Sequence, residues 1–266
     1  MDTLAALRDL DVPTVTTVVV VALVAALLAT DPLLGRRQHA ALVARTAAAP
    51  DAESRDGILR RFYRSWTWQG WFCGAVAVVA ALMLPGIGLA DLGLRLPDLG
   101  SLAPQGGDHT MSLVVGAVVG FAVAAVALVL LQRRRPTSRP PHNAAVDAMM
   151  PATPAARRGW AGLALSAGVT EEITYRGLVV LALALAVPGL PHGAVVVVAA
   201  VLFGFAHWYQ GWIGMVSTGV VGAAFTQLYL TTGSLLLPMM LHVLVDLRPL
   251  LSRPQPSAVP DAAGVR

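Results

Sequence analysis

Long apolar segments alternate along the chain with polar segments that are rich in arginine. A helix of about 20 residues crosses the roughly 30 Å hydrocarbon core of a bilayer. Seven apolar segments come close to this length, and they are residues 13–30, 70–90, 111–131, 160–187, 192–208, 212–230 and 235–250. The pattern therefore predicts an all-α fold, a polytopic transmembrane helical bundle of about seven spans.

Three segments leave the number of spans open. Residues 160–187 are long enough for a helix that projects into the cytosol or for a helix with a break. An eighth, partly amphipathic helix could lie within residues 41–64. The first segment could be mistaken for a signal peptide. Its N-terminal flank carries three aspartates and one arginine instead of a basic cluster, so we expect a membrane helix.

The composition excludes an ordinary soluble domain. Of the 266 residues, 56% are hydrophobic and 13% are charged, with a mean hydropathy of +0.67. Soluble domains are about 25% charged. All 19 basic residues are arginine, a bias that we attribute to the source genome and that is typical of a bacterial protein. The single cysteine, Cys73, can form no internal disulfide, and we expect it to be a small buried apolar residue.

The positions of the arginines predict the topology. Residues 31–69 hold seven arginines, residues 132–159 hold six, and the tail after Leu247 holds three. Cytoplasmic loops of membrane proteins carry an excess of arginine, so seven spans predict an outside N-terminus and a cytoplasmic C-terminus in the plasma membrane. We expect these arginines to set topology and to contact anionic lipids, and we expect no nucleic-acid partner.

The chain divides into three predicted regions. Residues 1–158 form an N-terminal transmembrane region of about three spans with basic cytoplasmic loops and no charge within its spans. Residues 159–250 form a core of about four spans that holds every residue with suggestive chemistry. Residues 136–154 are predicted to be a flexible linker, and residues 251–266 a cytoplasmic tail.

Charged residues interrupt the apolar segment at 160–187. An ionisable side chain near the centre of a membrane helix costs roughly 2.5 to 3.5 kcal/mol, which by default marks a functional site with a partner. Glu172 and Arg176 stand at i and i+4 and are predicted to pair. Glu171 lies about 100 degrees further around the helix, where it is freer to do chemistry. The reverse assignment, with Glu171 as the structural partner and Glu172 active, stays open.

Three further polar residues follow on two other apolar segments. With the predicted topology, Glu171 lies about 16 Å along its helix from the cytoplasmic end. His207 ends one segment at its cytoplasmic side, and His242 and Asp246 lie in the cytoplasmic half of another. The four groups therefore converge in one half of the membrane. Taken singly, His207 could be an interface anchor, and His242 could satisfy carbonyls freed by a kink at Pro238.

These residues form three motifs in order, each on its own apolar segment. They are Glu-Glu-x-x-x-Arg at Glu171 to Arg176, Phe-x-x-x-His at Phe203 and His207, and His-x-x-x-Asp at His242 and Asp246. In this the chain resembles the CPBP family of intramembrane proteases, which includes the CAAX proteases and bacteriocin-processing (Abi) enzymes and is related to the type II CAAX prenyl endopeptidase. The resemblance covers the core region, whereas the front half is matched only in being transmembrane.

The resemblance implies a hydrolase site. Glu171 and His207 would hold and deprotonate a water molecule, and His242 and Asp246 would stabilise the oxyanion. Glu172 and Arg176 would be a supporting ion pair, and Tyr175 and Phe203 are candidates for the substrate groove. Peptide hydrolysis needs both a base and a stabiliser of developing negative charge.

Asp246 departs from the family, which often has asparagine at this position. An ionised aspartate cannot donate to an oxyanion, so Asp246 is protonated, or orients His242, or helps to bind a metal. His207, His242 and Glu171 could hold a divalent metal such as zinc. A metal-independent mechanism of glutamate and histidine is equally open, because the chain lacks a His-Glu-x-x-His signature.

The sequence thus predicts an integral-membrane endopeptidase that acts on a membrane-bound or lipid-modified, CAAX-like peptide. A secreted peptide, a bacteriocin leader or a membrane regulator is an equal candidate for its substrate. Two other functions stay open. One is a non-catalytic immunity or scaffold protein of the same fold, and the other is a proton-coupled transporter, against which the charge-free front half speaks.

Overall fold

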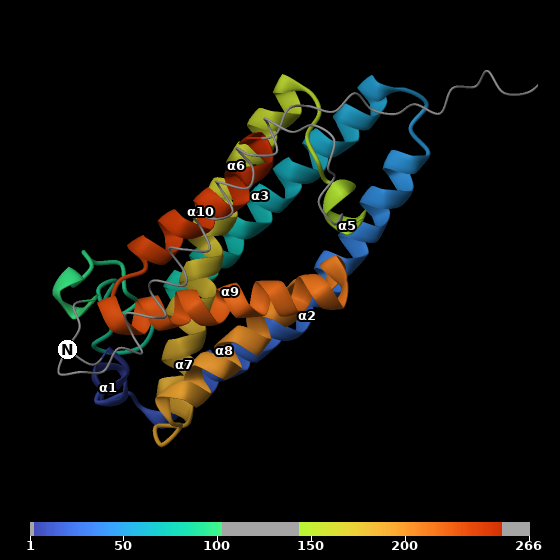
Figure 1. Ribbon diagram of the computed structural model, residues 1–266. Helices are drawn as coiled ribbons and strands as arrows, with labels where there is room; N and C mark the ends of the chain where they lie inside the picture. The colour runs from blue at the N-terminus through green and yellow to red at the C-terminus, as the bar shows by residue number, and fades with distance from the viewer. Residues whose placement is uncertain (1–2, 103–143, 252–266) are drawn as a thin grey trace, which may run out of the picture.

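The structure is a computed structural model, and it describes residues 3–102 and 144–251 (Figure 1). Within these ranges the chain is helical and contains no strand, which confirms the all-α class. The longer helices are α2 (Thr14–Ala47), α3 (Ala52–Leu82), α6 (Pro154–Glu172), α8 (His192–Ala206), α9 (Gly211–Thr232) and α10 (Leu236–Leu251). The shorter elements are α1 (Thr3–Arg8), η1 (Leu99–Leu102), α5 (Ala144–Asp147), the π-helix η2 (Ile173–Leu178), α7 (Val179–Ala186) and η3 (Trp208–Gln210).

Four of the seven predicted spans correspond closely to helices, and the first two overlap the longer helices α2 and α3. Helices α8, α9 and α10 lie within two residues of the predicted limits, and α6, η2 and α7 form one uninterrupted helix over the fourth predicted span. By length and composition, two helices in the described ranges can cross a membrane, Thr14–Ala47 and Trp208–Thr232. The predicted third span at 111–131 and the tail at 252–266 lie outside the described residues.

The prediction of a long basic loop at residues 31–69 is wrong. Helix α2 continues to Ala47 and α3 begins at Ala52, so all seven arginines of this stretch lie on helices. Residues 41–64, where an eighth helix was predicted, contain the end of α2 and the start of α3 and form no separate helix. Asp51 caps α3, since its side chain accepts a hydrogen bond from the amide of Ser54 at 2.7 Å. The local sequence therefore forms a helical hairpin where the arginines suggested a loop.

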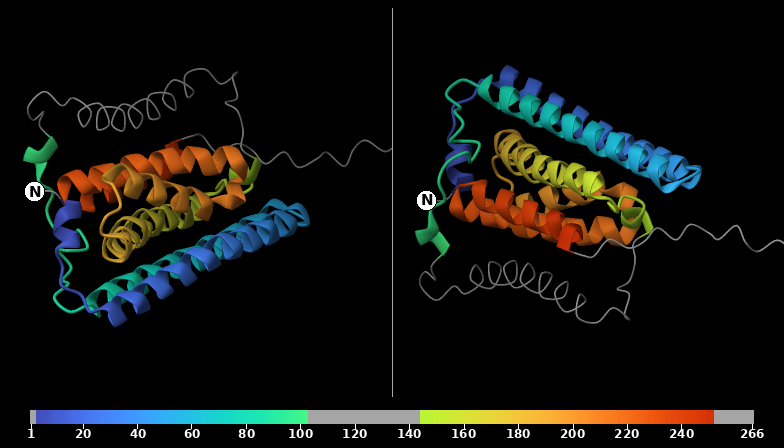
Figure 2. Two further views of the ribbon diagram at one scale, coloured as in Figure 1. Left: turned by 90° about the horizontal axis from the view of Figure 1, so that it is seen from below. Right: turned by 90° about the horizontal axis from the view of Figure 1, so that it is seen from above.

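The helices form two packed parts. Helices α2 and α3 run side by side as a hairpin along one side of the bundle, as both views in Figure 2 show. Helix α6 packs between α3 and α10, and α8 packs along α9 (Figure 1). Thr153 caps α6 by accepting from the amide of Ala156, and Pro154 occupies its first turn, where no backbone donor is needed.

Glycines allow the closest helix contacts. A Cβ at Gly168 of α6 would lie 2.8 Å from the backbone nitrogen of Val243 on α10. A Cβ at Gly74 of α3 would lie 2.9 Å from Thr170 on α6, and one at Gly204 of α8 would lie 2.6 Å from the carbonyl of Met215 on α9. Small residues at such positions let helix backbones approach in a membrane, where apolar burial alone gives no preference for helix contact.

Candidate active site

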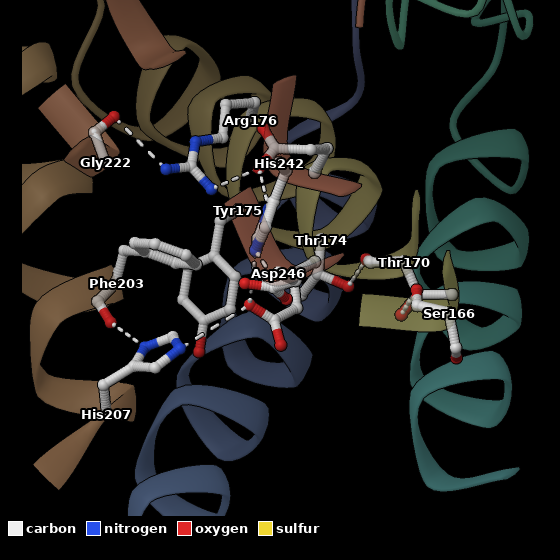
Figure 3. A network of polar contacts seen from close by, with 12 residues as sticks. Ser166, Thr170, Thr174, Tyr175, Arg176, Phe203, His207, Gly222, His242 and Asp246 are labelled. Carbon is white, nitrogen blue, oxygen red and sulfur yellow. Dashed lines mark hydrogen bonds and ion pairs between the residues drawn. The ribbon is translucent and has the colours of Figure 1, made fainter. Parts of the chain in front are cut away.

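A cavity of about 570 Å³ lies between the α2–α3 hairpin and the core helices. Glu171, His207, His242 and Asp246 all line it. They come from α6, the end of α8 and one face of α10 (Figure 3). The four residues that the sequence singled out as catalytic candidates thus share one cavity.

The wall behind this cavity holds a buried ionic network. Arg176 donates to Glu172 Oε1 at 3.0 Å, so the predicted ion pair is present, with both side chains almost fully buried. The same carboxylate oxygen lies 2.7 Å from Nδ1 of His242. Arg176 also donates to the carbonyl of Gly222 on α9, and its guanidinium stacks 4.0 Å over the ring of Phe203. Glu172 is therefore committed to structural partners.

Glu171 has the opposite environment. Its side chain is 31% exposed, towards the cavity, and Oε2 has no hydrogen-bond partner among the described residues. Oε2 lies 3.8 Å from Nε2 of His207 and 3.9 Å from Nε2 of His242. These separations are too long for direct hydrogen bonds, and they suit a small molecule held between the groups. Glu172 Oε2 also has no hydrogen-bond partner among the described residues, but Glu172 is fully buried and is not among the residues that line the cavity. The place of Glu171 on the cavity wall therefore supports it as the reactive glutamate over the reverse assignment.

The hydrogen bonds of the two imidazoles define which nitrogen carries hydrogen. His207 Nδ1 lies 2.9 Å from the carbonyl oxygen of Phe203, and a carbonyl can only accept. Neutral His207 therefore presents the lone pair of Nε2 to the cavity. His242 Nδ1 faces Glu172, and its Nε2 lies 3.6 Å from Asp246 Oδ2 and 3.9 Å from Glu171 Oε2. Both ring nitrogens of His242 therefore face carboxylate oxygens.

Two local features set the direction of these side chains. The π-helix η2 begins directly after Glu172 and carries Tyr175 and Arg176. Such wider turns are rare overall but are often found at functional sites, and the residue pattern did not predict this one. Pro238 lies in the first turn of α10, so the kink predicted there is absent and His242 satisfies Glu172 instead of freed carbonyls.

The substrate-groove candidates Tyr175 and Phe203 also line the cavity. Their rings meet edge to face at 5.1 Å. Tyr175 donates its hydroxyl to Oδ2 of Asp31 at 2.9 Å. Asp31 lies inside α2 next to Pro32 and lines the cavity, one residue beyond the predicted end of the first span. Sequence reasoning missed Asp31 because the residues after it looked like a loop.

The placement of the donors does not fit the hypothesis of a metal held by His207, His242 and Glu171. Among residues 3–102 and 144–251, no group of three or more histidine, cysteine, aspartate or glutamate side chains could hold a metal ion. Zinc needs its ligand atoms about 2.0 to 2.3 Å from the metal, which brings them closer together than the separations seen here.

Residues 155–248 match the family model described as type II CAAX prenyl endopeptidase Rce1-like. This segment is similar to that family, and it is about a third of the chain. No curated protein and no solved structure matches the chain. This Rce1-like segment contains all three motifs and runs from the start of α6 to near the end of α10. The resemblance drawn from Glu171, His207 and His242 is thereby confirmed at the level of the family.

The Rce1-like family is a family of membrane proteases, so the match supports a membrane protease for the segment that it covers. The segment does not account for the whole cavity. Asp31 on α2 and Cys73 on α3 line it from outside the matched residues. The hairpin therefore completes the walls of a site whose motifs all lie in the Rce1-like segment.

Proposed function

We propose that this protein is an intramembrane endopeptidase whose Glu171 and His207 activate water. The observation that carries the proposal is the approach of Glu171 Oε2 to Nε2 of both His207 and His242 inside one cavity. Its substrate is a membrane-bound or lipid-modified peptide. With seven spans, the N-terminus lies outside, the C-terminus lies in the cytoplasm, and the site opens to the cytoplasmic half of the plasma membrane.

Water binds between two acceptors. One hydrogen of the water points to the Glu171 carboxylate and the other to the lone pair of His207 Nε2, which leaves an oxygen lone pair for the substrate. The water oxygen attacks the carbonyl carbon of the scissile peptide bond while Glu171 takes a proton. A positioned general base of this kind contributes about 10²- to 10⁴-fold to the rate.

His242 stabilises the negative charge that develops on the carbonyl oxygen. Its Nε2–H donates to the oxyanion, while Glu172 fixes the ring through Nδ1. Asp246 Oδ2 lies 3.6 Å from the same nitrogen of His242 in the resting site, too far for a hydrogen bond, and as a nearby acceptor it orients the ring, which is a role that an aspartate can fill in place of asparagine. The tetrahedral intermediate collapses when Glu171 returns the proton to the leaving nitrogen, and the peptide C–N bond breaks.

Cleavage of a peptide library by the purified protein tests this function. The library combines prenylated and unprenylated C-terminal peptides with unmodified membrane segments and leader peptides, and mass spectrometry identifies the cut bonds. Cleavage by the wild type that disappears in Glu171→Gln supports the proposal. Cleavage at equal rates by both proteins would remove Glu171 from the chemistry and direct attention to Glu172.

One observation favours a second function, proton-coupled transport. Asp31, Glu171 and Asp246 all line the same cavity, so acidic groups from both halves of the chain meet there. Carboxylates in series inside a membrane protein can relay protons. Proton flux into liposomes that contain the purified protein, lost in Asp31→Asn and Glu171→Gln, would establish transport. Absence of flux together with peptide cleavage would reject it.

A further inference from the structure

A polar contact that the proposed chemistry does not use joins the first motif to the α2–α3 hairpin at the cavity. Tyr175 on η2 donates its hydroxyl to Oδ2 of Asp31 on α2 at 2.9 Å. Tyr175 is 4% exposed, and Asp31 is partly buried. Tyr175 lies within the Rce1-like segment and Asp31 outside it, so the contact joins the matched segment to the front half of the chain.

The hydroxyl of Tyr175 has competing acceptors close by. Tyr175 follows Glu171 by four residues on the same helix, which places the two side chains on one face. His207 Nε2 faces Glu171 across the cavity. Phe203, against which the Tyr175 ring packs, offers no acceptor on its side chain. A buried hydroxyl that loses Asp31 will therefore turn to Glu171 or to His207, because an unpaired buried donor is unfavourable.

Either alternative damages the site. Glu171 Oε2 and His207 Nε2 are the two atoms that must accept the hydrogens of the reactive water. A hydroxyl donated to one of them occupies that acceptor and lowers its strength as a base. In the structure Glu171 Oε2 has no hydrogen-bond partner among the described residues, so it is kept available.

We propose that Asp31 is a positioning residue of the site, which binds the hydroxyl hydrogen of Tyr175 and so keeps Glu171 and His207 free for water. This inference rests on the proposed hydrolytic function. It makes the α2–α3 hairpin part of the active site and not only a wall of the cavity. It also predicts that replacing Asp31 lowers the rate of cleavage only when the hydroxyl of Tyr175 is present.

The test compares kcat and KM of Asp31→Ala, Asp31→Asn, Tyr175→Phe and the double variant Asp31→Ala/Tyr175→Phe. Asp31→Ala should lower kcat at least about tenfold with little change in KM, within the range that a general base contributes. Asp31→Asn should keep most of the activity, because its amide oxygen still accepts from Tyr175. The double variant should recover the activity of Tyr175→Phe alone, since no hydroxyl is left to misplace. Asp9→Ala, at an exposed position of the N-terminal segment, is the matched control.

Cys73 supplies a readout that does not need turnover. It is the chain's single cysteine, and it lines the cavity, so bound peptide should slow its modification by a thiol reagent. Protection should be the same in wild type and Asp31→Ala if Asp31 only positions Tyr175. Lost protection or a raised KM would make Asp31 a substrate contact and overturn the proposal. Provided that the wild type cleaves the peptide, an unchanged kcat in Asp31→Ala would also overturn the proposal. A double variant as slow as Asp31→Ala would overturn it too. A wild type that cleaves no peptide would reject the hydrolytic function itself, and the role of Asp31 with it.

Discussion

Glu172 Oε1 lies 2.7 Å from Nδ1 of His242, although the two residues are 70 positions apart in the chain. The same oxygen accepts from Arg176, which in turn donates to the carbonyl of Gly222. One carboxylate thus joins α6 to α10, and its partner Arg176 continues the connection to α9. The ionic network is the support of the site, and the adjacent Glu171 is left to face the cavity.

Replacing Glu172 by alanine should lower the stability of the folded protein. The change leaves the guanidinium of Arg176 buried without its counter-ion, and breaking a buried pair costs about 3 to 5 kcal/mol. Thermal unfolding in detergent measures the loss. The chain offers a matched control in Glu53→Ala, because Glu53 is its third glutamate and is exposed. Equal unfolding temperatures for the two variants would contradict the structural role of Glu172.

Replacing Glu171 by glutamine should leave stability almost unchanged. Its Oε2 has no hydrogen-bond partner among the described residues, and the side chain reaches the cavity, so the folded state loses no strong contact. Glutamine also keeps the shape of glutamate and removes the charge of a carboxylate whose Oε2 is buried, so the folded state should not be weakened. The same unfolding experiment checks the prediction, and a large loss of stability in Glu171→Gln would exchange the roles assigned to the two glutamates.

Helix α6 provides a matched pair of glycines for testing its packing against α10. Gly168→Ala should destabilise the protein by about 1 to 3 kcal/mol, since the new methyl group meets the backbone of Val243. Gly162→Ala should be neutral or stabilising by up to about 1 kcal/mol, because a Cβ there meets no atom within 4 Å and alanine favours helix. Both unfolding temperatures shifting in the same direction would show that α6 and α10 are not in such close contact.

Much of the core could be predicted from the sequence. Pro191 directly precedes α8, Gly211 begins α9 and Gly233 directly follows α9, and residues of these two types commonly mark helix limits, so these limits were readable. The site residues were recognisable because charge in an apolar segment is rare. The spacing of Glu172 and Arg176 predicted their ion pair, because helical neighbours at i and i+4 meet regardless of the rest of the fold.

The remainder depends on contacts between distant parts of the chain. Hydropathy measures only the apolar part of a helix, so it ended the first span before Asp31, whereas α2 continues through residues that favour helix. The partners of Asp31 and Glu172 are Tyr175 and His242, each reached only through tertiary packing. No spacing rule connects such positions. The one available signal was an Asp-Pro pair within otherwise continuous helix-forming sequence.

Asp246 should tolerate asparagine better than an apolar residue. If it orients His242, Asp246→Asn keeps a polar acceptor within reach of Nε2 and retains most of kcat, whereas Asp246→Leu removes it. We expect Asp246→Leu to lose about 10²-fold, the cost of a small misplacement of a catalytic group. Peptide cleavage rates of the two variants decide this. A loss as large in Asp246→Asn as in Asp246→Leu would require the carboxylate itself in the reaction.

Removal of metal ions should leave peptide cleavage intact. The placement of His207, His242 and Glu171 is unlike a metal site, and the proposed water activation needs only their acceptor atoms. The measurement is the cleavage rate after exhaustive chelation, with the metal content of the sample determined by mass spectrometry. Loss of activity that returns on adding zinc would show that these side chains rearrange around a metal.

The reactivity of Glu171 is tested most directly by single-turnover cleavage of one membrane peptide by wild type, Glu171→Gln and Glu53→Gln. We predict that Glu53→Gln cleaves at the wild-type rate and that Glu171→Gln is slower by about 10²-fold or more, the contribution of a general base. Bound peptide should still protect Cys73 in Glu171→Gln, which separates lost chemistry from lost binding. Cleavage by Glu171→Gln at the rate of Glu53→Gln would contradict water activation by Glu171.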